Sequence, residues 1–241
     1  MTGARRVAAA GALTLTLATP LAAGAAQQDP LAPTRESSLI ARIVRPTPAH
    51  AGPDGTSPVR MRLRAYAAWA HGPVGLMVLG SRASSSGRLW LRVAVPSRPN
   101  GSTAWIDRDA VQLVRTRWRV RINRSERRLT VLRSGRAVRS ARVVIGAPST
   151  PTPRGRFAIY ERVRQPRDAV IGPWALHLTA YSRVLHSYDG GPGRIALHGR
   201  AGGLLADPLG SARSHGCVRM PNALVSWLAR RLRGGVPVDI R

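Results

Sequence analysis

One cysteine and two histidines lie within a short stretch near the end of the chain. Cys217 is the only cysteine among 241 residues, His215 lies two positions before it, and His198 opens the stretch. A thiolate is the nucleophilic form of cysteine, and an imidazole can take the thiol proton before or during attack. This combination predicts covalent catalysis by a cysteine nucleophile with a histidine base.

His198 and His215 compete for the role of base. Residues i and i+2 of an extended segment share a face, but the imidazole of His215 and the sulfur of Cys217 rarely align across so short an arc. His198 belongs to a separate predicted strand, so the fold can place it opposite the thiol. We therefore predict His198 as the general base and keep His215 as a further catalytic candidate.

Glycines stand beside both reactive side chains. Gly199 follows His198, and Gly216 precedes Cys217. Because glycine lets the backbone approach an acyl oxygen closely, the amides of His215, Gly216 and Cys217 are candidates for an oxyanion hole, with Gly199 as backbone support for the base. No side chain need supply that charge stabilisation.

The group that would orient the base is left open by the residues alone. Asp207 is the only acid between His198 and Cys217, but it precedes a proline in a glycine-containing loop, where aspartate is typical of a turn. A backbone carbonyl next to His198 is the alternative.

Two other interpretations compete with catalysis. A cysteine and two histidines can bind a transition metal, but the His-x-Cys spacing lacks the paired ligands of common zinc sites. A buried, inert cysteine with incidental histidines is the other. We favour nucleophilic catalysis, and we expect no metal and no cofactor.

The first 26 residues have the layout of a secretory signal peptide. Arg5 and Arg6 precede an apolar run over residues 7–17, and small residues continue to Ala25. The run is too short to span a bilayer, and no later stretch approaches the roughly 18 apolar residues that a span needs. We therefore predict export to an extracytoplasmic location and a mature protein without a transmembrane span; a retained N-terminal anchor is the alternative.

Arginine supplies every basic charge of the chain. The sequence has 38 arginines, no lysine and 11 acids, which gives a formal net charge of +27. Such a surplus predicts attraction to polyanions. A compositional bias toward arginine on a solvated surface is the alternative, and the absence of lysine favours it. No binding motif accompanies the arginines, so we expect no specific nucleic-acid partner.

Proline density and then strand-like alternation divide the next part of the chain. Prolines are frequent over residues 27–58, which we predict to be an extended linker. Over 59–115, short alternating runs are separated by turn residues such as Asn100-Gly101, which predicts a small antiparallel β-barrel. Its core is predicted to contain Trp69, Trp90 and Trp105.

Residues 116–241 are predicted to form a second domain of strands with one helix. Alternating runs from Trp118 predict a meander, which residues 146–153 interrupt. Asn222 can cap a helix whose apolar side chains fall on one face. A closing strand follows, and Pro237 predicts that it lies at a sheet edge.

Two segments of this second domain carry a resemblance to a known family. Ser214–Met220 reads SHGCVRM and follows IALHG at 195–199, while Gly146–Phe157 reads GAPSTPTPRGRF. Together they resemble the signature of the L,D-transpeptidase (YkuD-type) family. The resemblance implies a mainly β protein with a YkuD-like β-sandwich catalytic domain and one C-terminal helix. Residues 59–115 resemble the small SH3-like β units found beside such domains.

The resemblance also implies a reaction. Cys217 would attack the carbonyl between the third and fourth residues of a peptidoglycan tetrapeptide stem and release D-alanine. An amine of a neighbouring stem would take the thioester and form a 3→3 cross-link. His198 would be the base, oriented by the backbone carbonyl of Gly199, while Arg219 and Ser214 would bind substrate and His215 would line the pocket.

The family also carries a substrate-covering segment, which would fall here over residues 163–173. The remaining histidines show no partner in the sequence and are interpreted as structural; they are His50, His71, His177 and His186.

Two functions compete with a transpeptidase that joins donor and acceptor stem peptides. Water in place of the acceptor amine would give a carboxypeptidase that trims stems, a difference that depends on how well the acceptor site excludes water. A non-catalytic protein that binds anionic wall polymers through its arginines and small barrel is the other. The intact set of His198, Gly216, Cys217 and Arg219 favours catalysis over this binding role. The predicted signal peptide places that catalysis in the cell wall or periplasm.

Overall fold

The computed structural model describes Thr2 and residues 29–241. Apart from Thr2, the predicted signal peptide lies outside the described residues. Strands supply most of the regular structure, and the described part of the chain contains one α-helix, so the mainly β class is confirmed. Within these residues no helix is both long and apolar enough to cross a membrane.

Residues 29–116, here called the N-terminal unit, contain one antiparallel sheet. Its strands are β1 (Ser38–Ile43), β2 (Thr47–His50), β3 (Val59–Leu63), β4 (Gly75–Ala83), β5 (Leu89–Ala94), β6 (Thr103–Asp107) and β7 (Val111–Thr116), with a 3-10 turn η1 (Arg108–Ala110) before β7. They lie in the order β3-β2-β6-β5-β4-β1-β7. Three of these pairings join consecutive strands, and three join strands distant in sequence, namely β2 with β6 and β1 with both β4 and β7.

The predicted linker over residues 27–58 is wrong for residues 38–50, which form β1 and β2. β1 pairs with both β4 and β7, and all its side chains except Arg42 are buried. The apolar run 39–43 drives this strand into the core, because burying such side chains stabilises the fold by roughly 1.5–3 kcal/mol each. The high proline count on either side obscured that run in the sequence.

The predicted tryptophan core is confirmed for one of its three members. Trp90 is 6% exposed, whereas Trp105 is only partly buried and Trp69 is 49% exposed. The core of the unit is built mainly from aliphatic side chains, including Leu76, Leu91 and Ile106. The assignment of Trp69 to the core is wrong because the residue lies on the loop between β3 and β4, outside the sheet.

Residues 117–241, here called the C-terminal unit, contain an eight-stranded sheet. Its strands are β8 (Trp118–Asn123), β9 (Arg128–Arg133), β10 (Arg136–Arg142), β12 (Gly155–Arg164), β13 (Trp174–Tyr181), β14 (Arg194–His198), β16 (Val218–Arg219) and β17 (Pro237–Ile240). They lie in the order β10-β9-β8-β17-β12-β13-β14-β16. A short parallel pair, β11 (Ile145–Gly146) with β15 (Ala212–Ser214), a 3-10 turn η2 (Gly202–Ala206) and the helix α1 (Asn222–Arg231) complete the unit.

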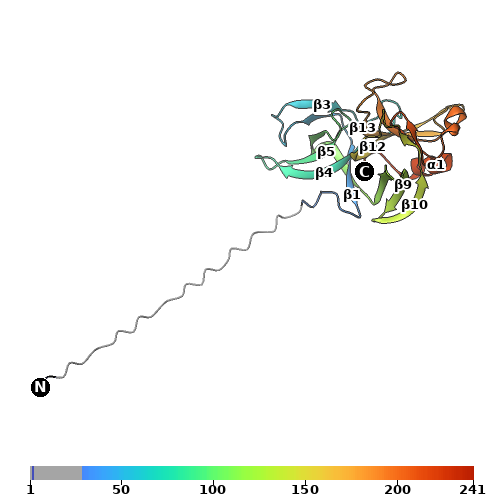
Figure 1. The fold of residues 1–241 in the computed structure, drawn as a ribbon. Coiled ribbons are helices and arrows are strands. Elements are labelled where there is room, and N and C mark those ends of the chain that lie inside the picture. The colour runs from blue at the N-terminus through green and yellow to red at the C-terminus, as the bar shows by residue number, and fades with distance from the viewer. Residues whose placement is uncertain (1, 3–28) are drawn as a thin grey trace.

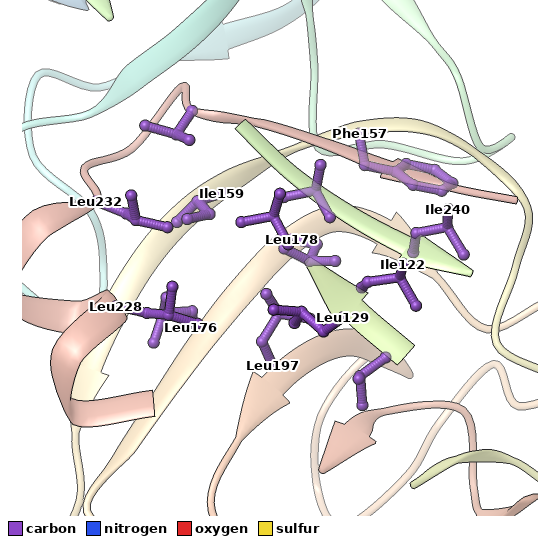
Figure 2. Close-up of a cluster of buried hydrophobic side chains, with 14 of the residues drawn as sticks. Ile122, Leu129, Phe157, Ile159, Leu176, Leu178, Leu197, Leu228, Leu232 and Ile240 are labelled. Atoms are coloured by element: carbon purple, nitrogen blue, oxygen red, sulfur yellow. The ribbon is translucent and has the colours of Figure 1, made fainter. Parts of the chain in front are cut away.

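The helix packs on the C-terminal sheet through its apolar face. α1 buries Val225, Leu228 and Ala229, and Leu232 follows them into the same core. Figure 2 shows Leu228 beside Leu176 of β13. In Figure 1, β3, β4 and β5 lie on one side of the molecule and β9, β10 and α1 lie on the other.

The predicted edge position of Pro237 is wrong. β17 lies inside the sheet, antiparallel to β12 and parallel to β8. Proline is tolerated here because it is the first residue of the strand, where its missing N–H costs least. The neighbouring residues carry the pairing, since Ile159 donates to the Val236 carbonyl and Gly235 donates to the Ile159 carbonyl.

Candidate active site

Strand register aligns the reactive side chains in a row across the C-terminal sheet. His177 of β13 lies opposite Ala196 of β14. The pairing of Leu197 with Val218 places Cys217 beside Ala196, whose N–H lies 3.4 Å from the Cys217 sulfur. We call His177, Ala196 and Cys217 the thiol row.

A second row lies next to the thiol row. Ala175, His198 and Arg219 are opposite one another on β13, β14 and β16. Because side chains alternate between faces with a period of two, both rows project from the same face of the sheet. His198 and Cys217 are therefore diagonal neighbours, and both line one pocket of about 460 Å³.

The backbone fixes the orientation of the His198 ring. Its Nδ1 lies 2.8 Å from the Gly199 carbonyl oxygen, and since a carbonyl only accepts, Nδ1 carries the proton and Nε2 is left as the basic nitrogen. Burial lowers the pKa of His198 to about 4, and the nearby charge of Arg219 acts in the same direction. His198 is therefore neutral at pH 7, as a general base must be.

The Cys217 thiol is also neutral at rest. Burial raises its pKa above the ordinary value, more than the Ala196 N–H and the Arg219 charge lower it. A neutral thiol beside a neutral imidazole favours proton transfer during attack over a preformed ion pair.

The turn before Cys217 is built around Ser214. The Ser214 hydroxyl accepts from the Gly216 N–H at 3.1 Å and donates to the Cys217 carbonyl at 2.5 Å. Ser214 is 1% exposed, and both of these bonds lie within the turn, so its side chain shapes the backbone around Cys217. Because the Gly216 N–H is already bonded, the amides of His215 and Cys217 remain as the oxyanion-hole candidates.

Gly216 itself cannot carry a side chain. Its φ is +119°, and a Cβ there would approach Ile195 Cδ1 to 2.9 Å. Both the backbone conformation and the packing therefore favour glycine next to Cys217.

The segment over residues 146–153 supports this turn from below. Thr152 is fully buried, accepts from the Gly146 N–H at 2.9 Å and donates to the Gly216 carbonyl at 2.8 Å. Thr150 donates to the Ser214 carbonyl at 3.1 Å. Neither threonine was singled out in the sequence, although both belong to the second segment that carried the family resemblance.

Arg219 has a counter-ion that the sequence did not reveal. Its Nη1 lies 2.5 Å from an Asp207 carboxylate oxygen, and Arg213 lies 3.9 Å from the other oxygen. The side chain of Arg219 is 8% exposed, so this ion pair is largely removed from water. Asp207 therefore forms an ion pair with Arg219. It does not orient His198, whose Nδ1 is bonded to the Gly199 carbonyl.

Asn222 binds the loop after His198 and does not cap the helix. The helix is preceded by Pro221 and has no side-chain cap. The Asn222 amide instead accepts from the Arg200 N–H at 2.8 Å and donates to the Arg200 carbonyl at 2.9 Å. A Cβ on Gly199 would come within 2.1 Å of the Asn222 oxygen, which explains the glycine beside the base.

His215 lies at the exposed rim of the pocket. Its Nδ1 is 3.2 Å from the Tyr188 hydroxyl, and the two rings lie 4.9 Å apart. Tyr188 belongs to residues 182–193, here called the covering loop, which lines the pocket together with residues of the predicted covering segment such as Val170 and Ile171.

The N-terminal unit binds both ends of the covering loop. Arg98 donates to the carbonyls of Ser182, Leu185 and Pro192 at 2.5, 3.1 and 3.1 Å. Asn100 bonds both backbone groups of Tyr181, at 2.7 and 2.8 Å. The turn over 98–102 predicted from Asn100-Gly101 thus has a second role, which is to anchor the loop above the thiol.

His177 and Trp69 also line the pocket, and the sequence assigned neither of them to the site. The ring of Trp69 lies 5.1 Å from that of His177. His177 was interpreted as a structural histidine; it is packed beside Trp69 on the wall of the same pocket. Across residues 29–241, no group of three or more His, Cys, Asp or Glu side chains is arranged to hold a metal ion.

A family model for the L,D-transpeptidase catalytic domain (YkuD) matches residues 117–240, just over half of the chain. The chain belongs to this family. The transpeptidase match spans the whole eight-stranded sheet and both rows of the site, which confirms the resemblance seen in the sequence. Among curated proteins, none matches the chain.

Solved structures of L,D-transpeptidases are similar at low identity. One is a mutant of the Enterococcus faecium enzyme (18% identity, 52% of this chain and 49% of that chain, TM-score 0.37). Others are from Mycobacterium smegmatis (16%, 64% and 90%, 0.38) and Mycobacterium tuberculosis, L,D-transpeptidase 3 with a faropenem-derived adduct (13%, 70% and 91%, 0.41). The chain spans about half the length of the Enterococcus structure.

Proposed function

We propose that the protein is an exported L,D-transpeptidase that uses Cys217 to form 3→3 cross-links between peptidoglycan stem peptides. The observation that carries the proposal is the pairing of Cys217 with His198 in one pocket, with His198 Nδ1 bonded to the Gly199 carbonyl. That arrangement supplies a nucleophile and a correctly oriented base, which are the two groups that acyl transfer requires.

The first half of the proposed reaction forms a thioester. The Cys217 sulfur attacks the carbonyl carbon after the third stem residue while His198 Nε2 takes the thiol proton. The amides of His215 and Cys217 stabilise the oxyanion. The carbon–nitrogen bond to the fourth residue then breaks, and His198 returns the proton to the departing amine, which leaves as D-alanine.

The second half transfers the acyl group. An amine of a second stem attacks the thioester carbonyl and gives its proton to His198. The carbon–sulfur bond breaks, the cysteine regains a proton from His198, and an amide joins the two stems. Water in place of the amine would yield a shortened stem, which is the carboxypeptidase outcome.

Charge and export complete the proposal. The net charge of +27 would draw the protein to the anionic polymers of the cell wall, where its substrates lie. The basic, apolar and small-residue order of residues 1–26 supports export.

Intact mass of the purified protein after mixing with a carbapenem tests the nucleophile. We expect one carbapenem-sized adduct on the wild type and none on Cys217→Ala. A carbapenem adduct at the same level on both would contradict the assignment of the nucleophile. Adding a stem tetrapeptide with and without a second amine then separates the functions: a dimer supports the transpeptidase, and D-alanine release without any dimer supports the carboxypeptidase.

A further inference from the structure

Trp69 reaches the catalytic pocket from the other unit. It lies on the loop between β3 and β4, and the buried Glu161 carboxylate accepts from the Trp69 N–H at 3.4 Å and from the Ala70 N–H at 3.2 Å. Glu161 lies opposite His177 in the β12–β13 ladder, so it extends the thiol row by one strand. The loop is thereby fixed at the far end of the row that begins at Cys217.

An exposed aromatic face and a cation meet at this position. The Trp69 side chain remains 49% exposed although its ring packs beside His177. The Arg194 guanidinium lies 6.0 Å from the Trp69 ring, and 4.9 and 4.8 Å from the rings of Tyr160 and Tyr181. Aromatic rings thus position the guanidinium. Its Nη1 donates to the Leu178 carbonyl at 3.4 Å, which leaves Nη2 for a ligand.

Two polar atoms here have no partner. Nδ1 of His177 and Nε of Arg194 are buried without a hydrogen bond in the described part of the chain. Arg194 also forms no ion pair with any acid among residues 29–241. Arg219, the other arginine that lines the pocket, is already paired with Asp207. The pocket therefore contains a cation that lacks a counter-charge.

The spacing of strands gives the distance from this position to the thiol. His177 is two strands away from Cys217, which corresponds to about 10 Å at roughly 4.8 Å per strand. Ala196, a small residue, lies between them and leaves room above the sheet. An extended peptide covers that distance in about three residues.

We propose that Trp69, His177 and Arg194 form a subsite for a carboxylate-bearing residue of the donor peptide, two to three residues before the carbonyl that Cys217 attacks. The proposal rests on the proposed function, in which the leaving group is a single amino acid and is too short to reach this distance. The acyl side of the donor must therefore occupy the subsite, with its carboxylate on Arg194 and its backbone against Trp69.

Binding of a donor tetrapeptide to variants that lack the thiol tests the subsite without turnover. In the Cys217→Ala background, we expect Trp69→Ala to raise the dissociation constant measured by calorimetry about tenfold, the order expected for loss of an aromatic contact. Trp69→Phe should restore part of it. Trp105→Ala is the matched control, because Trp105 belongs to the same unit and does not line the pocket. Equal affinity in the Trp69→Ala and Trp105→Ala variants would overturn the subsite.

The charge is tested with a second pair of donors that carry a carboxylate or a carboxamide at the relevant residue. The Cys217→Ala protein should bind the carboxylate form at least fivefold more tightly, and Arg194→Gln should remove the preference. No preference in the starting protein would overturn the role of Arg194.

The rate of carbapenem acylation in the thiol-containing protein separates the two proposals. A carbapenem needs only the thiol end of the pocket, so Trp69→Ala should acylate at the wild-type rate. Failure of the wild type to acylate would contradict the proposed function, whereas normal acylation with unchanged peptide binding in Trp69→Ala would contradict only the subsite.

Discussion

Burial decides the protonation of His198 and Cys217, the two residues proposed to react. It lowers the pKa of His198 to about 4 and raises that of Cys217, so in the proposed reaction attack would start from an uncharged pair. In many cysteine enzymes a nearby cation instead lowers the thiol pKa. Here the one cation close to both groups, Arg219, is neutralised by Asp207, and burial has the larger effect.

The low pKa of His198 predicts the acidic limit of the reaction. We expect the rate of carbapenem acylation to stay near its neutral value well below pH 6.5 and to fall with an apparent pKa near 4, because protonation of His198 removes the base. His198→Gln should slow acylation at pH 7 by roughly 100-fold or more. Acylation that instead fell with an apparent pKa near 6.5 would show that His198 is more solvated than the structure has it.

At the scale of elements, the site depends on loops fixed by side chains far away in sequence. Arg98 and Asn100 bind the covering loop, Thr152 supports the turn before Cys217, and Asn222 binds the loop after His198. Each of these contacts is made to a backbone carbonyl or amide of the loop. The side chains of the loop therefore do not indicate the contacts, and the loop sequence cannot be used to predict them.

Arg98→Ala should free the covering loop. Three carbonyls lose their donor, so we expect faster amide hydrogen exchange over residues 182–193 and roughly tenfold slower carbapenem acylation. Arg98→Lys should not restore either property, because one ammonium lacks the planar fork that reaches several acceptors. Arg88→Ala, which removes an exposed ion pair of the same unit, is the control. Unchanged exchange in Arg98→Ala would show that the loop is fixed by other contacts.

The sequence predicted the parts of the site that are local. Cys217, His198 and their glycines follow one another closely. The pattern of alternation predicted the strands from Trp118 onward better than those of the N-terminal sheet, where β1 and β2 lay in the predicted linker. Trp69 was misassigned because its partner Glu161 is 92 positions away, and the aromatic type alone favours the core. Pro237 was placed at an edge because sequence shows the missing N–H, whereas its position at the start of an interior strand depends on two neighbours elsewhere in the chain.

At the scale of the whole molecule, the N-terminal and C-terminal units are in close contact where Gly75 and Ile40 meet Gly234 and Gly235. The contact there is too close for Gly75 or Gly235 to carry a side chain. A Cβ on Gly75 of β4 would come 2.6 Å from the Gly234 carbonyl oxygen, and a Cβ on Gly235 would come 2.5 Å from Ile40 Cγ2. Ile40 of the N-terminal unit also belongs to the hydrophobic core of the C-terminal unit. We therefore expect the two units to unfold together.

Two buried histidines predict how stability depends on pH. Burial lowers the pKa of both His177 and His198 to about 4, from an ordinary value near 6.5. Between these values the unfolded chain takes up protons that the folded protein does not. The free energy of unfolding should therefore be highest above pH 6.5 and fall as the pH drops toward 4, by about 1–3 kcal/mol for each histidine.

Urea unfolding at pH 7 and pH 4.5 measures this dependence. His177→Gln should reduce the loss of stability at low pH, whereas His186→Gln, at an exposed position, should leave it unchanged. An equal loss in the wild type and His177→Gln would show that groups other than His177 dominate acid unfolding.

The anchoring of the covering loop by Arg98 has a practical consequence for inhibitor discovery. A truncated protein limited to residues 117–241 would keep Cys217, His198 and the full sheet, and it would be the natural choice for screening. It would lack Arg98 and Asn100, which bind the covering loop, and Trp69, which lines the pocket. Compounds would therefore be ranked against a pocket whose covering loop is less firmly held and whose aromatic lining is incomplete. Selection on the two-unit protein would favour compounds that also contact Trp69, a residue that residues 117–241 do not contain.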